Sequence, residues 1–99
     1  MSDCVFTQLD ARIVKGEKNI FFIYPVVSVN STRDAVEIFS VELDGHELVP
    51  SARGEVKSGS NTFEILPVTL VNPRGTYKLE VKHHPSIGQI TGITMEITI

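Results

Sequence analysis

Residues 75–82 read Gly-Thr-Tyr-Lys-Leu-Glu-Val-Lys, and this alternation of apolar and polar residues decides the fold class. In an extended chain, Tyr77, Leu79 and Val81 lie on one face and the polar residues between them lie on the other. Such a segment is typical of an antiparallel strand with one buried and one solvent-facing side. The same period of two recurs in residues 93–99, where Ile and Met alternate with Thr and Glu.

Turn signals separate the alternating segments. Asp44-Gly45 joins the apolar-rich runs 36–43 and 46–49, and this dipeptide tolerates the positive φ angles of a two-residue hairpin turn. Pro50 is expected to end the returning strand. Further clusters of turn-forming residues occupy 57–61, 71–75 and 83–88, and no window keeps apolar residues at helical spacing. We therefore predict an all-β fold in which residues 1–99 form a single domain, an antiparallel β-sandwich of seven to eight strands.

The composition of the chain limits the kinds of partner and the cellular locations that we expect for it. The chain has 99 residues, of which 41% are hydrophobic and 21% are charged, so it can form a packed core. Its net charge of −3 disfavours nucleic acid as a partner, because phosphate binding needs a basic face. No apolar run reaches the roughly 20 residues that span a membrane, and the first residues lack the basic and apolar regions of a signal peptide. We expect a cytoplasmic or virion protein that contacts no membrane and is not secreted by a signal peptide.

Two segments resemble strand elements of immunoglobulin-like domains of bacterial-surface and phage structural proteins. They are residues 41–48, Val-Glu-Leu-Asp-Gly-His-Glu-Leu, and residues 75–81, Gly-Thr-Tyr-Lys-Leu-Glu-Val. The resemblance covers residues 41–99 and implies an immunoglobulin-like sandwich, in which the hydroxyl of Tyr77 ties its strand to the preceding loop. The Cys…Trp…Cys pattern of antibody domains is absent, and no functional residue carries over. Because domains of this kind bind or space other proteins, the resemblance implies a non-enzymatic structural or interaction module, most concretely a phage decoration, tail or neck component.

One stretch departs from the alternation. Residues 19–29 read Asn-Ile-Phe-Phe-Ile-Tyr-Pro-Val-Val-Ser-Val, so both faces of a strand here are apolar. One interpretation places a bulge or an edge position at Pro25, which would turn residues 20, 22 and 24 toward the core. The other predicts a protein-contact surface, through which the chain binds a protein partner or self-associates into a homo-oligomer. The residues predicted for this surface are Phe21, Ile23, Pro25 and Val27.

Three histidines and the single cysteine are the candidate ligands for a transition metal: His46, His83, His84 and Cys4. Their spacing matches no metal-binding motif, and adjacent histidines on a strand point to opposite faces, so metal binding stays open. The simplest interpretation of His83-His84 is an exposed polar loop. Cys4 is interpreted as a small buried hydrophobe rather than as a nucleophile with a histidine base. Because no nucleophile, base and orienting group can be named together, we expect no enzymatic activity and no cofactor.

Two alternatives of other classes stay open. A small inhibitor of a cytoplasmic host protein would use the loops at 71–75 and 83–88 as its contact surface. A calcium-dependent binding domain would use the carboxylates of Glu42, Asp44 and Glu47 around the hairpin turn as hard oxygen ligands. A carbohydrate-binding domain would stack a sugar on Tyr24 and Phe21. The chain contains no Trp, the residue best suited to stacking on a sugar.

Overall fold

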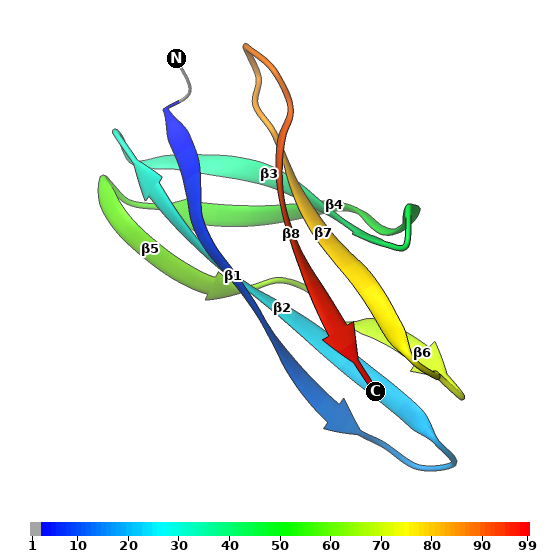
Figure 1. The fold of residues 1–99 in the computed structure, drawn as a ribbon. Helices are drawn as coiled ribbons and strands as arrows, with labels where there is room; N and C mark the ends of the chain where they lie inside the picture. Colours follow the sequence, from blue (N-terminus) through cyan, green and yellow to red (C-terminus); the bar gives the residue numbers. More distant parts are fainter. Residues whose placement is uncertain (1–2) are drawn as a thin grey trace.

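The computed structural model describes residues 3–99, which form eight strands in two packed antiparallel sheets and no helix (Figure 1). The strands are β1 (Cys4–Lys15), β2 (Ile20–Ser31), β3 (Ala35–Leu43), β4 (His46–Val56), β5 (Gly59–Glu64), β6 (Val68–Val71), β7 (Thr76–His84) and β8 (Thr91–Thr98). In the first sheet the order is β1-β2-β5, and β6 also pairs with β2; in the second sheet the order is β4-β3-β7-β8. The all-β prediction is confirmed, and so is the arrangement as a two-sheet sandwich of eight strands.

The core lies between the inner faces of the two sheets and follows the alternation in the sequence. In β7, Leu79 and Val81 are completely buried and Glu80 between them is not, as the period of two predicts. At the centre of the core the ring of Phe39 packs between Phe6, at 5.9 Å, and Phe63, at 5.4 Å between ring centroids. The buried apolar residues are Cys4, Ile23, Val27, Val29, Phe39, Val41, Leu43, Val49, Ala52, Val56, Ile65, Val68, Leu79, Val81 and Ile97.

The predicted hairpin at Asp44-Gly45 is confirmed. Asp44 and Gly45 have φ angles of 50° and 83°, the left-handed conformation that the turn requires. The prediction that Pro50 ends the returning strand is wrong, because β4 continues through Pro50 to Val56. Pro50 lies in an edge strand at a register shift, between the Val41–Val49 and Phe39–Ala52 pairs, and both an edge position and a bulge accommodate a proline.

The prediction of a bulge or edge position at Pro25 is also wrong. Strand β2 lies in the interior of the first sheet, and its register with β1 is continuous around Pro25. On its other side Pro25 lies between β5, which ends at Glu64, and β6, and its carbonyl accepts a hydrogen bond from the N–H of Ile65 (2.8 Å). The missing N–H of the proline therefore faces the gap between two partner strands. The bulge lies in β1 instead, between Phe6 and Gln8.

The molecule is elongated, with extents of 43 × 21 × 19 Å. The start of β1, the β2–β3 loop and the β7–β8 loop lie toward one end, and the β1–β2 hairpin reaches the other end (Figure 1). Within residues 3–99 there is no helix with the length and apolar character needed to cross a membrane. The surfaces available for contact with a partner are the outer sheet faces, the open strand edges and the loop ends.

Candidate functional site: an apolar strip and a loop-end pocket

The structure places the predicted contact residues of β2 mainly in the core. Ile23 and Val27 have no exposed surface, and Pro25 is among the most completely buried side chains. Phe21 is half-buried. The interface prediction is wrong for Ile23, Pro25 and Val27, because these residues face the second sheet and fill the space between the layers.

The opposite side of β2 carries the apolar residues that reach the surface. Ile20, Phe22, Tyr24 and Val26 alternate with the core residues and are all half-buried. On the same outer face, Phe22 pairs with Val14 of β1 and Ile20 pairs with Val71 of β6. Val14 and Val71 are 37% and 67% exposed. We call this surface the outer strip; it consists of Val14, Ile20, Phe22, Tyr24, Val26 and Val71.

Charged side chains fix one border of the outer strip. The guanidinium of Arg12 lies 4.1 Å from the centre of the Tyr24 ring, and its Nε donates a hydrogen bond to Glu64 Oε1 at 2.9 Å. This hydrogen bond, together with the charge of Arg12, lowers the pKa of Glu64 and keeps its carboxyl ionised. The border is therefore an ordered ion pair across three strands, and the apolar residues continue from it toward the β1–β2 hairpin.

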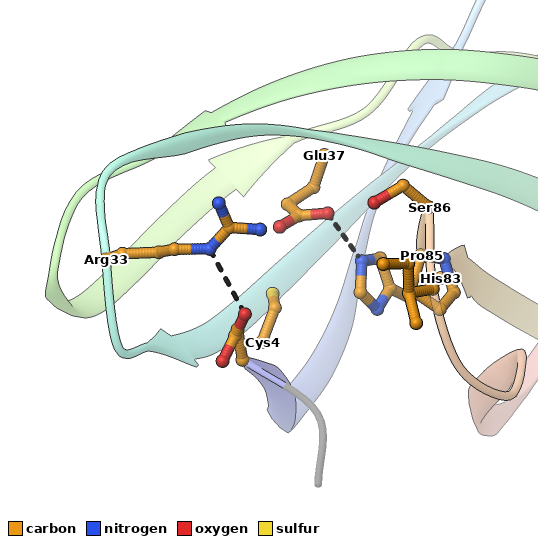
Figure 2. A pocket seen from close by; sticks show the side chains of 8 residues that line it. Cys4, Arg33, Glu37, His83, Pro85 and Ser86 are labelled. Atoms are coloured by element: carbon orange, nitrogen blue, oxygen red, sulfur yellow. Dashed lines mark hydrogen bonds and ion pairs between the residues drawn. The ribbon is translucent and has the colours of Figure 1, made fainter.

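A pocket of about 220 Å³ lies at the loop end of the sandwich, where β1 begins and the β2–β3 and β7–β8 loops meet (Figure 2). Its lining includes Cys4, Arg33, Glu37, His83, Pro85 and Ser86. Figure 2 shows Glu37 and His83 pointing toward one another. Arg33 forms an ion pair with Asp3, with 3.1 Å between Nε and Oδ2. These residues are distant in sequence and are brought together by the pairing of β3 with β7 and of β1 with β2.

The pocket contains a buried acid–histidine pair. His83 Nε2 and Glu37 Oε2 lie 2.9 Å apart, and the two residues are only 2% and 8% exposed. Nδ1 of His83 is buried without a hydrogen-bond partner among the described residues. The prediction that His83-His84 forms an exposed loop is wrong, because β7 continues to His84 and directs His83 into the core against the ring of Phe39. The sequence gives no sign of the pair, because Glu37 and His83 are separated by 46 residues.

Cys4 lines the same pocket, and its interpretation as a buried small hydrophobe is confirmed by its 2% exposure. Burial and, secondarily, the negative charge of Glu37 raise the pKa of the Cys4 thiol to about 11. At neutral pH the group is a thiol rather than a thiolate, and the thiolate is the nucleophilic form. The electrostatics of the pocket therefore disfavour a cysteine nucleophile.

The histidines do not converge on one point. His83 pairs with Phe39 in register and His46 pairs with Leu43, four residues away along β3, or about 13 Å. His84 points to the opposite face from His83, where its Nε2 lies 2.7 Å from the hydroxyl of Ser40. Within residues 3–99 no three His, Cys, Asp or Glu side chains are placed to hold a metal ion together.

The remaining candidate positions also lie apart or are engaged. Asp44 accepts a hydrogen bond from the Lys78 N–H at 2.7 Å, and Glu42 forms an ion pair with Lys82 at 2.6 Å, so two of the three candidate calcium ligands have protein partners. The loops at 71–75 and 83–88 flank the two ends of β7, roughly 27 Å apart. They cannot form one continuous contact surface.

These features define the chain as an all-β protein, a two-sheet antiparallel sandwich with a half-buried apolar strip on one outer face. No family model matches the sequence, and no curated protein is significantly similar to it. The crystal structure of a protein from Archaeoglobus fulgidus is similar in fold, with a TM-score of 0.50 and 14% sequence identity. The match covers 95% of this chain and 97% of that chain. At this identity the likeness shows the fold alone.

Proposed function

We propose that this protein is a non-enzymatic interaction module that binds a protein partner through the outer strip, with the rest of the sandwich as a rigid scaffold. The observation that carries the proposal is the apolar run Ile20, Phe22, Tyr24 and Val26 on the solvent side of an interior strand. The solvent side of a sandwich strand is ordinarily polar, and clustered apolar surface on a folded protein marks an interaction site. A phage decoration, tail or neck component is the concrete form that we propose for the module.

We also propose that the sandwich is of the immunoglobulin-like type. Two observations support this assignment. The fifth strand of the chain pairs with the second, so the chain crosses between sheets as in a Greek key. The hydroxyl of Tyr77 accepts a hydrogen bond from the backbone N–H of Arg74 at 3.0 Å, the contact expected of a tyrosine corner.

The test compares two valine positions of similar exposure on different sheets. Val71 belongs to the outer strip and is 67% exposed, whereas Val36, on β3, is 52% exposed and lies outside it. We immobilise the wild-type chain and each of the variants Val71→Asp and Val36→Asp. Each chain is then used to capture partners from extracts of the native host and from virus particles. We expect wild type and Val36→Asp to retain the same partner and Val71→Asp to lose it by at least tenfold, because a charge in an apolar contact must be desolvated. Equal capture by all three chains, or no specific capture, contradicts the proposal.

The β7–β8 loop supports a second candidate, an inhibitor that inserts this loop into a host protein. Ile87 is 90% exposed at the rim of the pocket, and Ile90 is 58% exposed. Under this function Ile87→Asp abolishes capture of the partner and Val71→Asp does not. Ile87→Asp, added to the same set of immobilised chains, therefore separates the two functions.

A further inference from the structure

Strand β1 presents an open edge of the first sheet. It pairs with β2 on one side and forms a ladder with no other described strand, although β8 of the second sheet lies close to it. Natural sheets shield open edges with bulges, prolines or inward-pointing lysines. In β1 the bulge lies near Phe6 and a lysine stands at the far end, Lys15. Residues 8–14 between them contain no bulge, lysine or proline, and their two charged residues, Asp10 and Arg12, are of opposite sign.

The direction of the backbone groups along this segment follows from the ladder. Gly16 donates its N–H to the carbonyl of Ile20 at 2.7 Å, so the even-numbered residues of the segment bond to β2 and the odd-numbered residues direct their N–H and C=O away. The N–H of Ala11 confirms this, because it donates to Asp10 Oδ1 at 2.8 Å rather than to β2. Leu9, Ala11 and Ile13 therefore carry the hydrogen-bonding groups of the open edge.

We propose that residues 8–14 of β1 pair antiparallel with the same residues of a second copy of this chain, around a twofold axis at Ala11. The proposal rests on the proposed function as an interaction module and adds self-association at a neighbouring surface. In this register Leu9 faces Ile13 on the inner side, and the two small Ala11 side chains meet at the axis. On the outer side Asp10 of each copy faces Arg12 of the other.

Charge and geometry select this register. The odd-numbered residues must lie opposite one another, because only their backbone N–H and C=O groups point away from β2 and are available for pairing. A twofold axis at Asp10 or at Arg12 satisfies this condition but places like charges directly opposite each other, which is destabilising. An axis at Leu9 brings the bulge into the ladder, and an axis at Ile13 extends it past the end of β1 at Lys15. The axis at Ala11 is the one that opposes unlike charges along an unbroken strand.

This pairing joins the first sheet of one copy to the first sheet of the other copy and forms one continuous surface. The two outer strips would then lie side by side, with their β2 strands three strand spacings, or about 14 Å, apart. A ladder of about six main-chain hydrogen bonds is small for a protein interface, and it must displace the Asp10–Ala11 bond of each copy. The dimer is therefore weak, and it forms at high local concentration, as on a repetitive assembly.

Sedimentation velocity from about 10 μM to about 1 mM measures the dimerisation directly. We expect a concentration-dependent dimer for the wild type and at least a tenfold higher dissociation constant for Ala11→Pro. This substitution removes an N–H that points away from β2, so the ladder between β1 and β2 stays complete. The matched control is Thr94→Pro on β8, the edge of the other sheet, where the N–H also points outward because the odd residues of β8 face β7. A wild type that stays monomeric over the whole range, or an Ala11→Pro chain that dimerises as the wild type does, overturns the proposal.

Charge reversal tests the register itself. Asp10→Arg and Arg12→Asp each place like charges opposite each other and weaken the dimer, and the double variant restores it. Glu64→Gln is the control for the lost Arg12–Glu64 pair and leaves dimerisation unchanged. A double variant as weak as the single variants overturns the register. The outer strip is intact in Ala11→Pro. If this variant still captures the protein partner, its dimerisation result bears on the dimer proposal alone and leaves the proposed function unaffected.

Discussion

Substitution of Gly54 by alanine tests the packing of the sandwich at its tightest point. Gly54 is buried in β4, and a Cβ atom built on it would lie 2.9 Å from Phe39 Cε2 and from both Cε2 and Cζ of Phe63. Phe39 is 1% exposed and cannot move without displacing the core, so the half-buried Phe63 ring must yield. Gly54 has no positive φ, so the effect of the added methyl group is steric.

The size of the effect follows from two opposing terms. Overpacking of a well-packed core reduces the free energy of unfolding by about 1–3 kcal/mol. Replacing a glycine by alanine restricts the unfolded chain, which increases the free energy of unfolding by about 0.4–1 kcal/mol. The net loss for Gly54→Ala is about 1–2 kcal/mol, which lowers the melting temperature of a domain of this size by roughly 5–15 °C.

Thermal and urea unfolding followed by circular dichroism measure this loss. The matched control is Gly92→Ala, where the new Cβ meets the flexible carboxylate of Glu80 at 2.8 Å and is otherwise in ordinary contact with Lys82 Cγ at 3.6 Å, so we expect a change within about 0.5 kcal/mol. Phe63→Leu introduced into Gly54→Ala should restore part of the loss, giving a favourable coupling free energy in a double-mutant cycle. A melting temperature for Gly54→Ala equal to or above that of the wild type refutes the reasoning.

Four further predictions concern the Tyr77 corner and the pocket. Tyr77→Phe removes the acceptor for the Arg74 N–H and lowers the free energy of unfolding by about 1 kcal/mol in urea titrations; an unchanged midpoint contradicts a structural role for the hydroxyl. Glu37→Ala leaves His83 Nε2 buried without its partner and costs about 2–4 kcal/mol, whereas Glu37→Gln, which keeps an acceptor, costs less; equal losses would show that the pair does not act through its hydrogen bond. Because the pKa of Cys4 is raised to about 11 from 9.0, the folded chain should react with iodoacetamide at pH 8 roughly 100-fold more slowly than the unfolded chain. The free energy of unfolding should also fall between pH 9 and about 11, where the unfolded thiol has already released its proton, and a smaller fall in Cys4→Ser is the control.

The strands with one polar face could be predicted from the sequence because alternation specifies the buried side. In β7 the order of Tyr77, Leu79 and Val81 determines which residues face the core, and the structure agrees. The Asp44-Gly45 turn carries its own backbone preference, so its position needs no tertiary information. Local pattern and local geometry agree in these elements.

Strand β2 shows where this reasoning ends. When both faces are apolar, alternation gives two equivalent sets of residues and no means of choosing between them. The choice made by the fold depends on β5 and β6, whose junction accommodates Pro25 and places Ile23 and Val27 inward. Pairing between segments about 40 residues apart leaves no local mark in the sequence. The same holds for Glu37 and His83, which only the pairing of β3 with β7 brings together.

The two apolar faces of β2 therefore have different explanations. The inner face of β2 is explained completely by the core, so its composition says nothing about partners. The outer face is not explained by the core, and it borders the one long stretch of β1 whose backbone groups lack strand partners. Positions 20, 22 and 24 lie on the outer face of β2, so packing between the two sheets does not require apolar residues there. Retaining Ile, Phe and Tyr there, next to an edge with self-complementary charges at Asp10 and Arg12, favours a surface that is covered in an assembly.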